Sequence, residues 1–186
     1  MSMQVPIEAV SARRIAVLAD CHIHPGGGPE FPPGVLEALA GVDLIVTLGD
    51  MGEAAALDQL AAIAPVTGTH GADDSDDPRT APQFRALNLG PAGVVGCVFD
   101  ATAAGLAAGS EPFAPVPGWS DAAAQFFGAD ARILLHAATH RAEIATVDGW
   151  TVVNPGSAVL PADGDVRSFA LLTVADGAVT AEIVRL

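Results

Sequence analysis

Short apolar runs that end in an acidic residue are the feature that most limits how this chain can fold. The run 14–19 ends at Asp20, and the run 43–48 ends at Gly49 and Asp50. Such runs, rich in β-branched residues, are typical of buried strands. Segments of helical composition alternate with them, and this alternation predicts a parallel α/β unit. The two expected helices cover 33–40 and 53–63.

The second half of the chain has a different pattern, in which short strands are separated by turn residues. Asp148-Gly149 and Asp176-Gly177 are typical of two-residue hairpin turns. The segment 102–119 is rich in Ala, Gly and Pro, and we expect it to form a mobile loop. A parallel half followed by an antiparallel half predicts two packed sheets with helices outside. The other expected elements are a helix at 120–127 and strands at 85–89, 94–99, 132–136, 143–147, 151–153, 169–174 and 179–184.

The length and composition predict one domain in a reducing compartment. A chain of 186 residues fits a single hydrophobic core, with residues 1–12 as an N-terminal extension. No apolar run reaches the roughly 20 residues that a bilayer span needs, and residues 1–11 lack the features of a signal peptide. Cys21 and Cys97 are too few for a disulfide framework. We therefore expect a cytoplasmic protein with two free thiols and no membrane contact.

The charge of the chain limits its partners. The formal net charge is −14, and the eight basic residues are scattered arginines. Tight nucleic-acid binding needs a basic surface that releases counterions, so the sequence predicts none. An anionic phosphate substrate would need a metal ion to offset the negative charge.

Polar residues gather where the predicted strands end. Carboxylates and imidazoles placed together offer the oxygen and nitrogen donors that suit Mn²⁺, Fe, Zn²⁺ or Ni²⁺. Taken singly, each of these clusters is more often a turn or a helix cap. The clusters are Asp20-Cys21-His22, Gly49-Asp50, Gly68-Thr69-His70, Thr139-His140 and Asn154-Pro155-Gly156-Ser157.

The order and spacing of these clusters resemble the calcineurin-like metallophosphoesterase superfamily. The resemblance is greatest to its small bacterial and archaeal phosphodiesterase branch, which also contains the retromer scaffold subunit. It extends from about Arg14 to the C-terminus. It implies an α/β fold, a four-layer α/β/β/α sandwich of two mixed sheets with flanking helices.

The resemblance also implies the ligands of one divalent transition metal. Asp20 and His22 match the D-x-H motif, Asp50 matches the bridging carboxylate, and His140 matches the last His of G-H-x-H. We expect these four residues to hold a single ion of Mn, Ni, Zn or Fe. The alternatives are an empty or water-filled pocket in which they serve packing, or a site completed by other ligands.

The ligands of the second metal that the resemblance implies are absent. Thr69 stands in the position of the Asn, and Ala138 stands in the position of the first His of G-H-x-H. The central strand ends in Val98-Phe99 in place of a His, and no His lies between Gly71 and Leu135. The predicted site therefore holds at most one metal.

Three other histidines and an acidic run need an interpretation. The resemblance implies that His70 protonates the leaving group, which an imidazole can do near neutral pH; a plain loop His is the alternative. His24 and His136 are the candidates for additional ligands, but a surface or hydrogen-bonded His is the favoured interpretation of both. The run 73–77 lacks the pattern of a calcium loop and is expected to be a solvated loop.

Two functions from different classes follow from these residues. The first is a metal-dependent phosphoesterase for phosphodiesters or small phosphomonoesters, with His70 and Asp50 in catalysis and with weak activity because the second metal is missing. The second is a catalytically inactive family member that binds a protein partner as a scaffold. A one-metal hydrolase of a non-phosphate ester is a third possibility.

Overall fold

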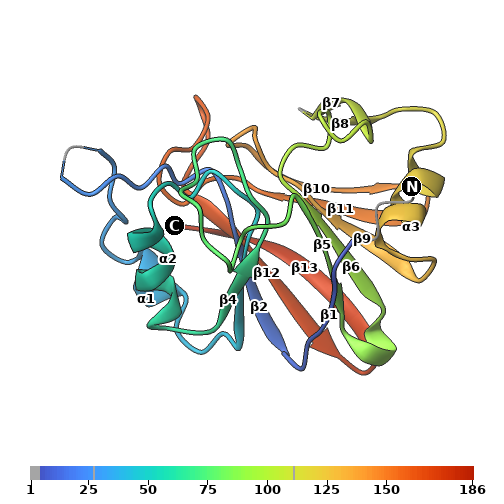
Figure 1. The fold of residues 1–186 in the computed structure, drawn as a ribbon, viewed down its shortest axis with the longest axis horizontal. Coiled ribbons are helices and arrows are strands. Elements are labelled where there is room, and N and C mark those ends of the chain that lie inside the picture. Colours follow the sequence, from blue (N-terminus) through green and yellow to red (C-terminus); the bar gives the residue numbers. More distant parts are fainter. Residues whose placement is uncertain (1–4, 27, 111) are drawn as a thin grey trace.

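One mixed sheet carries the first part of the predicted parallel unit. The computed structural model describes residues 5–26, 28–110 and 112–186. The strand order in this five-stranded sheet is β13-β12-β2-β3-β4 (Figure 1). Its three parallel strands are β2 (Arg14–Leu18), β3 (Leu44–Thr47) and β4 (Val66–Gly68), and the antiparallel strands β12 (Ser168–Ala175) and β13 (Ala178–Arg185) extend it.

A second mixed sheet contains six strands in the order β1-β5-β6-β9-β11-β10. Its middle strands β6, β9 and β11 are parallel, and β5 and β10 join them antiparallel. The bounds are β1 (Ile7–Ala9), β5 (Phe84–Asn88), β6 (Val94–Val98), β9 (Ala131–Leu135), β10 (Ala142–Val147) and β11 (Trp150–Pro155). The helices are α1 (Val35–Ala38), α2 (Ala54–Ala61), the 3-10 turn η1 (Gly90–Ala92) and α3 (Trp119–Phe127).

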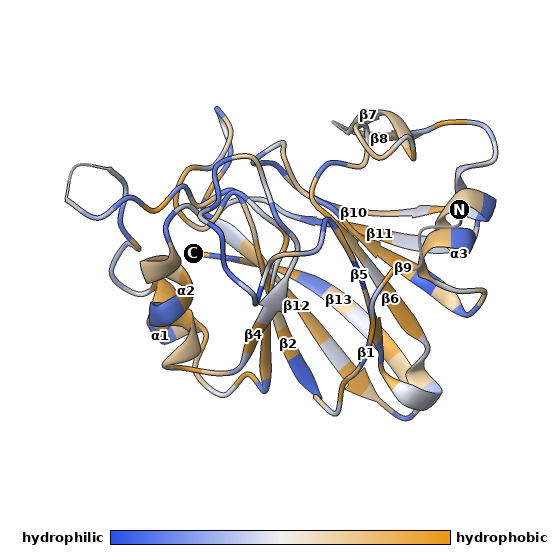
Figure 2. Cartoon of the chain, viewed as in Figure 1, coloured by the Kyte–Doolittle hydropathy of each residue, from blue (hydrophilic) through white to orange (hydrophobic). Residues whose placement is uncertain are grey.

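Three apolar clusters place these elements in layers. Alternate residues of β2 and β3, such as Ile15 and Val46, pack against Val95 and Leu135 of the six-stranded sheet. The helices cover the opposite, outer faces of the two sheets. Helices α1 and α2 pack on the five-stranded sheet, and α3 packs on the six-stranded sheet. Figure 2 shows the apolar residues concentrated along the strands. The predicted α/β fold with two mixed sheets and flanking helices is confirmed.

Two segments have more regular structure than their composition predicts. The segment 102–119 contains a two-stranded antiparallel sheet, formed by β7 (Ala107–Ser110) and β8 (Phe113–Pro115). Within the expected extension 1–12, residues 1–4 lie outside the described residues, but β1 pairs parallel with β5 at the edge of the sheet. A third segment has less regular structure than predicted. The helix expected over 33–40 is a single turn, because Gly34 adopts a left-handed conformation before it.

No helix in the described part of the chain is long and apolar enough to cross a lipid bilayer.

The contact between α3 and β6 gives a test of the packing. A Cβ on Gly96 would lie 2.5 Å from the ring of Phe127, so Gly96→Ala must displace a buried aromatic side chain. We expect this change to lower the free energy of unfolding by about 1–3 kcal/mol. The matched control is Gly109→Ala in β7, where the nearest atom to the new methyl group lies at 4.0 Å. Urea denaturation of both variants measures the difference, and equal stability would contradict this packing.

Candidate functional site

The predicted site residues lie at one edge of the five-stranded sheet. Because β2, β3 and β4 are parallel, with Leu18 beside Thr47 and Thr47 beside Gly68, their carboxyl ends meet at this edge. The loops that follow these three strands carry Asp20, His22, Asp50 and His70. His140 comes from the loop after β9, in the other sheet. Loops from both packed sheets therefore bring the predicted site residues to the same end of the molecule.

Asp20 is the most buried member of this group. Its carboxylate is fully buried and accepts the backbone N–H of Ala138 at 3.2 Å and of His140 at 3.1 Å. Burial raises the pKa of Asp20 to about 6; His140 and its backbone N–H oppose the rise, and the nearby charge of Asp50 adds to it. The carboxylate is therefore a buried negative charge that a cation would stabilise.

His22, Asp50 and His140 surround Asp20. The Nε2 atom of His22 lies 3.8 Å from Asp50 Oδ2, and the rings of His22 and His140 are 5.2 Å apart and nearly parallel. His140 donates through Nδ1 to the carbonyl of Leu160 at 2.6 Å. His22 donates through Nδ1 to Asp73 at 2.6 Å. In both rings the second nitrogen, Nε2, remains available to bind a metal ion. This is the usual arrangement of histidines that bind metals.

Backbone strain is concentrated in the same residues. Asp20, His22, Asp50 and His140 all have positive φ, between 49° and 58°. In the described part of the chain the only other non-glycine residues with positive φ are Ala138, in the same loop as His140, and the two aspartates of the Asp-Gly hairpin turns. A left-handed conformation costs a residue with a Cβ about 1–2 kcal/mol. Such strain persists where the surrounding structure enforces it, and it is common at functional sites.

Asp73 and Asp74 of the acidic run 73–77 belong to this site, so the interpretation as a solvated loop is wrong for these two residues, whereas Ser75 and Asp76 are exposed. Asp73 Oδ2 lies 2.6 Å from His22 Nδ1 and 2.8 Å from His24 Nε2, so one carboxylate joins two imidazoles. These hydrogen bonds, that of His22 first, hold the pKa of Asp73 below its usual range. The bond to Asp73 also raises the pKa of His24. The reason for the error is that the acceptors serve donors about 50 residues earlier in the chain.

Asp74 closes the loop from the other side. Its carboxylate accepts the backbone N–H of Met51 at 2.6 Å, of Gly52 at 3.1 Å and of Gly71 at 2.7 Å. A Cβ on Gly71 would lie 2.4 Å from Asp50 Oδ1, so only glycine permits this close approach. The loop thereby fixes the turn that presents Asp50.

The residues that the resemblance sets in place of second-metal ligands have other environments. Thr69 is buried and its hydroxyl donates to the carbonyl of Leu48 at 2.9 Å. The ring of Phe99 lies against Gly49, directly beside Asp50. Ala138 offers a methyl group. None of the three side chains presents a free oxygen or nitrogen atom to a metal.

The remaining predicted residues have different environments. His24 is half exposed and hydrogen-bonded to Asp73, as expected of a hydrogen-bonded His. His136 is fully buried, and no described residue hydrogen-bonds either ring nitrogen, so its interpretation as a surface or hydrogen-bonded His is wrong. Burial lowers the pKa of His136 to about 4. Its neighbour is the ring of Phe113 at 5.3 Å. Phe113 belongs to β8, so the sequence around position 136 could not predict that an aromatic ring covers His136.

The turn 154–157 is hydrogen-bonded to two loops of the site. Ser157 Oγ donates to the carbonyl of Asp20 at 2.7 Å, and Asn154 donates to the hydroxyl of Thr139 at 3.0 Å. The interpretation of this turn as structural support agrees with both contacts.

Comparison with known protein families identifies the superfamily. The model of the calcineurin-like phosphoesterase superfamily domain matches residues 14–177, which span both sheets and every candidate ligand. The chain belongs to the calcineurin-like phosphoesterase superfamily. A comparison with curated proteins finds no match.

Several solved structures share the fold over more than nine-tenths of the chain. Vps29 from Chaetomium thermophilum superposes with a TM-score of 0.69 at 22% identity, covering 94% of this chain and 97% of the other. Vps29 from Entamoeba histolytica, solved in complex with Zn²⁺, gives a TM-score of 0.62 at 22% identity, covering 92% and 98%. A novel archaeal phosphodiesterase gives 0.62 at 12% identity, covering 92% and 99%.

The superfamily generally uses divalent metals, and the residues of this site have donor atoms that suit such an ion. Two carboxylates and two imidazole Nε2 atoms are a suitable donor set for one transition metal. The buried Asp20 carboxylate, bonded only to backbone N–H groups, fits a cation as well. In the ranges that the structure describes, however, no three such side chains are already arranged as a metal-binding group. The carboxylate and imidazole groups lie near one another but do not surround a common metal position.

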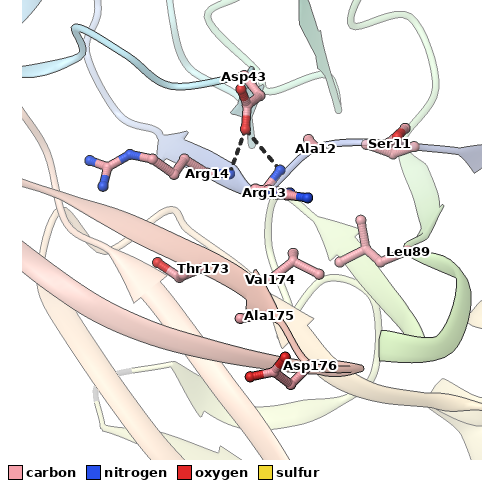
Figure 3. A pocket seen from close by; sticks show the side chains of 11 residues that line it. Ser11, Ala12, Arg13, Arg14, Asp43, Leu89, Thr173, Val174, Ala175 and Asp176 are labelled. Carbon is pink, nitrogen blue, oxygen red and sulfur yellow. Dashed lines mark hydrogen bonds between the residues drawn. The ribbon is translucent and has the colours of Figure 1, made fainter.

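A separate hollow lies at the far end of the same strands. It has a volume of about 800 Å³ and is lined by Arg13, Arg14, Asp43 and the end of β12 (Figure 3). Asp43 accepts the backbone N–H of Arg13 and of Arg14, both at 2.8 Å. None of the predicted site residues lines this hollow, so it is separate from the site.

The role of Asp74 can be tested by stability. Asp74→Ala leaves three backbone N–H groups without their charged acceptor, and a hydrogen bond to a charged group contributes about 1.5–3 kcal/mol. Because water can reach part of this loop, we expect a total loss of about 2–4 kcal/mol. The matched control is Asp76→Ala, in the same run but exposed. Thermal unfolding measures both, and equal melting temperatures would show that the loop is not held this way.

Proposed function

We propose that this chain is a metal-dependent phosphoesterase of low activity, acting on phosphodiesters or small phosphomonoesters. The observation that carries the proposal is the left-handed backbone shared by Asp20, His22, Asp50 and His140. Four strained residues from two sheets are costly for packing alone, because a right-handed or extended backbone would be cheaper. Their side chains also offer the carboxylate and imidazole donors that suit a transition metal, and all four lie within the range of the superfamily match.

One divalent transition metal is the cofactor in this proposal. Asp20, His22, Asp50 and His140 would hold it, with Asp73 orienting His22 through Nδ1. When bound, the metal would supply Lewis acidity toward the phosphoryl group and a lowered pKa for the attacking water. Asp50 is placed to hold the metal in a fixed orientation. One of its carboxylate oxygens, Oδ1, is held by the backbone N–H of Asp73 at 2.8 Å, which leaves Oδ2 for the metal.

His70 is the proposed general acid. It follows β4 on the loop beside Asp50, is half buried and lines two hollows of about 160 and 340 Å³. Its backbone N–H donates to the carbonyl of Pro82 at 3.2 Å, which fixes the loop, and the next residue, Gly71, lies against Asp50. A positioned imidazole can give a proton to a leaving alkoxide and contributes typically 10²- to 10⁴-fold.

Activity is expected to be weak because one electrostatic stabiliser is missing. Losing a single well-placed donor in a dry site costs roughly 10²- to 10³-fold in rate, and a whole metal ion carries more charge than a donor. Thr69, Phe99 and Ala138 offer no replacement for it. The net charge of −14 further disfavours an anionic substrate.

A non-catalytic scaffold is the second candidate function. The observation that favours it is the occupation of the second-metal positions by committed or apolar side chains, with Thr69 bonded to Leu48. The fold is shared with Vps29 as well as with a phosphodiesterase, so both functions are compatible with it. In this case the first-site residues would stabilise the junction between the sheets, and a protein partner would be bound elsewhere.

The first prediction from this proposal concerns metal content. Equilibrium dialysis with Mn²⁺ followed by elemental analysis should give at most one ion per chain. Asp50→Ala should weaken binding by about 100-fold or more, since even outer-shell changes cost 10- to 100-fold. Asp130→Ala, an exposed aspartate on another loop, is the matched control. Two tightly held ions per chain would overturn the one-metal proposal.

The second prediction concerns turnover. With bis(p-nitrophenyl) phosphate and Mn²⁺, Ni²⁺ or Zn²⁺, we expect a rate at least about 10²-fold below that of a relative with two metals. The residual rate should vanish in Asp50→Ala and fall about 10²-fold in His70→Ala with metal content unchanged. Turnover that survives Asp50→Ala would place the chemistry elsewhere. Full metal binding without any turnover would favour the scaffold.

A further inference from the structure

A narrow slot opens beside His70, on the side of the missing second metal. It has a volume of about 160 Å³ and lies between the loop after β4, the start of β5 and the segment that follows β6. Its walls include His70, Phe84, Phe99 and Ala104, with Asp100 at one side. An apolar cavity of about 150 Å³ is large enough to hold benzene. The slot therefore has room for one aromatic ring and little more.

Two phenyl rings form apolar walls of the slot, whose lining also includes the polar Gln83. Phe84 stacks on Phe126 of α3 with ring centroids 5.3 Å apart and planes within 8°. The ring of Phe99 lies against Gly49. Two anchored phenyl rings favour an aromatic occupant through offset or edge-to-face contacts.

The charges of the slot exclude an anionic occupant. No arginine lines it. Asp100 uses Oδ1 to accept the backbone N–H of Thr102 at 2.8 Å and of Ala103 at 3.1 Å, which fixes a carboxylate at the rim. A phosphate group or a second carboxylate would be repelled there. The occupant must be uncharged or cationic.

We propose that this slot binds the leaving group, and that the substrate is a phosphoester of an uncharged alcohol with a single aromatic ring. This inference rests on the proposed function, because a general acid at His70 must lie beside the leaving oxygen. The group attached to that oxygen then extends into the space that His70 shares with Phe84 and Phe99. Phe99, which stands in place of a metal-binding His, becomes a wall of the subsite.

Direct binding tests the slot without any need for turnover. Benzyl alcohol is titrated into metal-free protein, and amide shifts are followed in ¹H–¹⁵N spectra. We expect shifts at His70, Ala103 and Ala104, with an affinity at least about tenfold above that of ethanol, which has the hydroxyl without the ring. Ala104→Phe, which fills the slot, should weaken binding by about tenfold or more. Ala178→Phe on the exposed start of β13 is the matched control.

A second variant and a kinetic measurement complete the test. Phe99→Leu removes one aromatic wall while keeping apolar bulk, so binding should fall about 3- to 10-fold even if Ala104→Phe folds poorly. With aryl phosphodiesters, both variants should raise KM more than they lower kcat. Probe binding that is absent, equal for ethanol or unchanged in both variants overturns the subsite. If the probe binds as expected but no ester is hydrolysed, the proposed activity fails while the aromatic slot stands.

Discussion

The buried carboxylate of Asp20 is the interaction on which the site depends. It follows the end of β2 in one sheet and accepts backbone N–H groups of Ala138 and His140 from the other sheet. Its own carbonyl accepts the hydroxyl of Ser157, and its N–H donates to the carbonyl of Gly49. One residue thus joins four segments. Burying a charge is costly unless it is paired or hydrogen-bonded, so the loops that satisfy Asp20 are held in one arrangement.

Much of this arrangement could be predicted from strand ends. The runs before Asp20 and Asp50 are buried, parallel and adjacent, so position along the chain fixed which edge of the sheet they would reach. The motif around His140 could be placed beside them only through resemblance to a family, because periodicity alone does not say how two sheets face each other. The helix at 33–40 was overestimated, since the left-handed Gly34 and the short connection leave room for a single turn.

The acidic run shows why the rest could not be predicted. Four aspartates in five residues have the composition of a solvated loop, and nothing local distinguishes Asp73 and Asp74 from Asp76. The difference lies in distant donors: His22 and His24 for Asp73, and the turn after Asp50 for Asp74. Hydrogen bonds across about 50 residues leave no periodic signal. The same holds for His136, whose cover comes from β8 and not from its own strand.

Ala138 shows that the turn beside His140 is held through its backbone and not through its side chain. Its side chain has no donor atom, yet its backbone stays left-handed at φ 71°, a conformation that is costly for alanine. The N–H of Ala138 is bonded to Asp20, so the strain of this turn serves the Asp20 carboxylate whatever side chain stands at position 138. The backbone of the turn, and not its side chain, therefore joins Asp20 to the loop that carries His140.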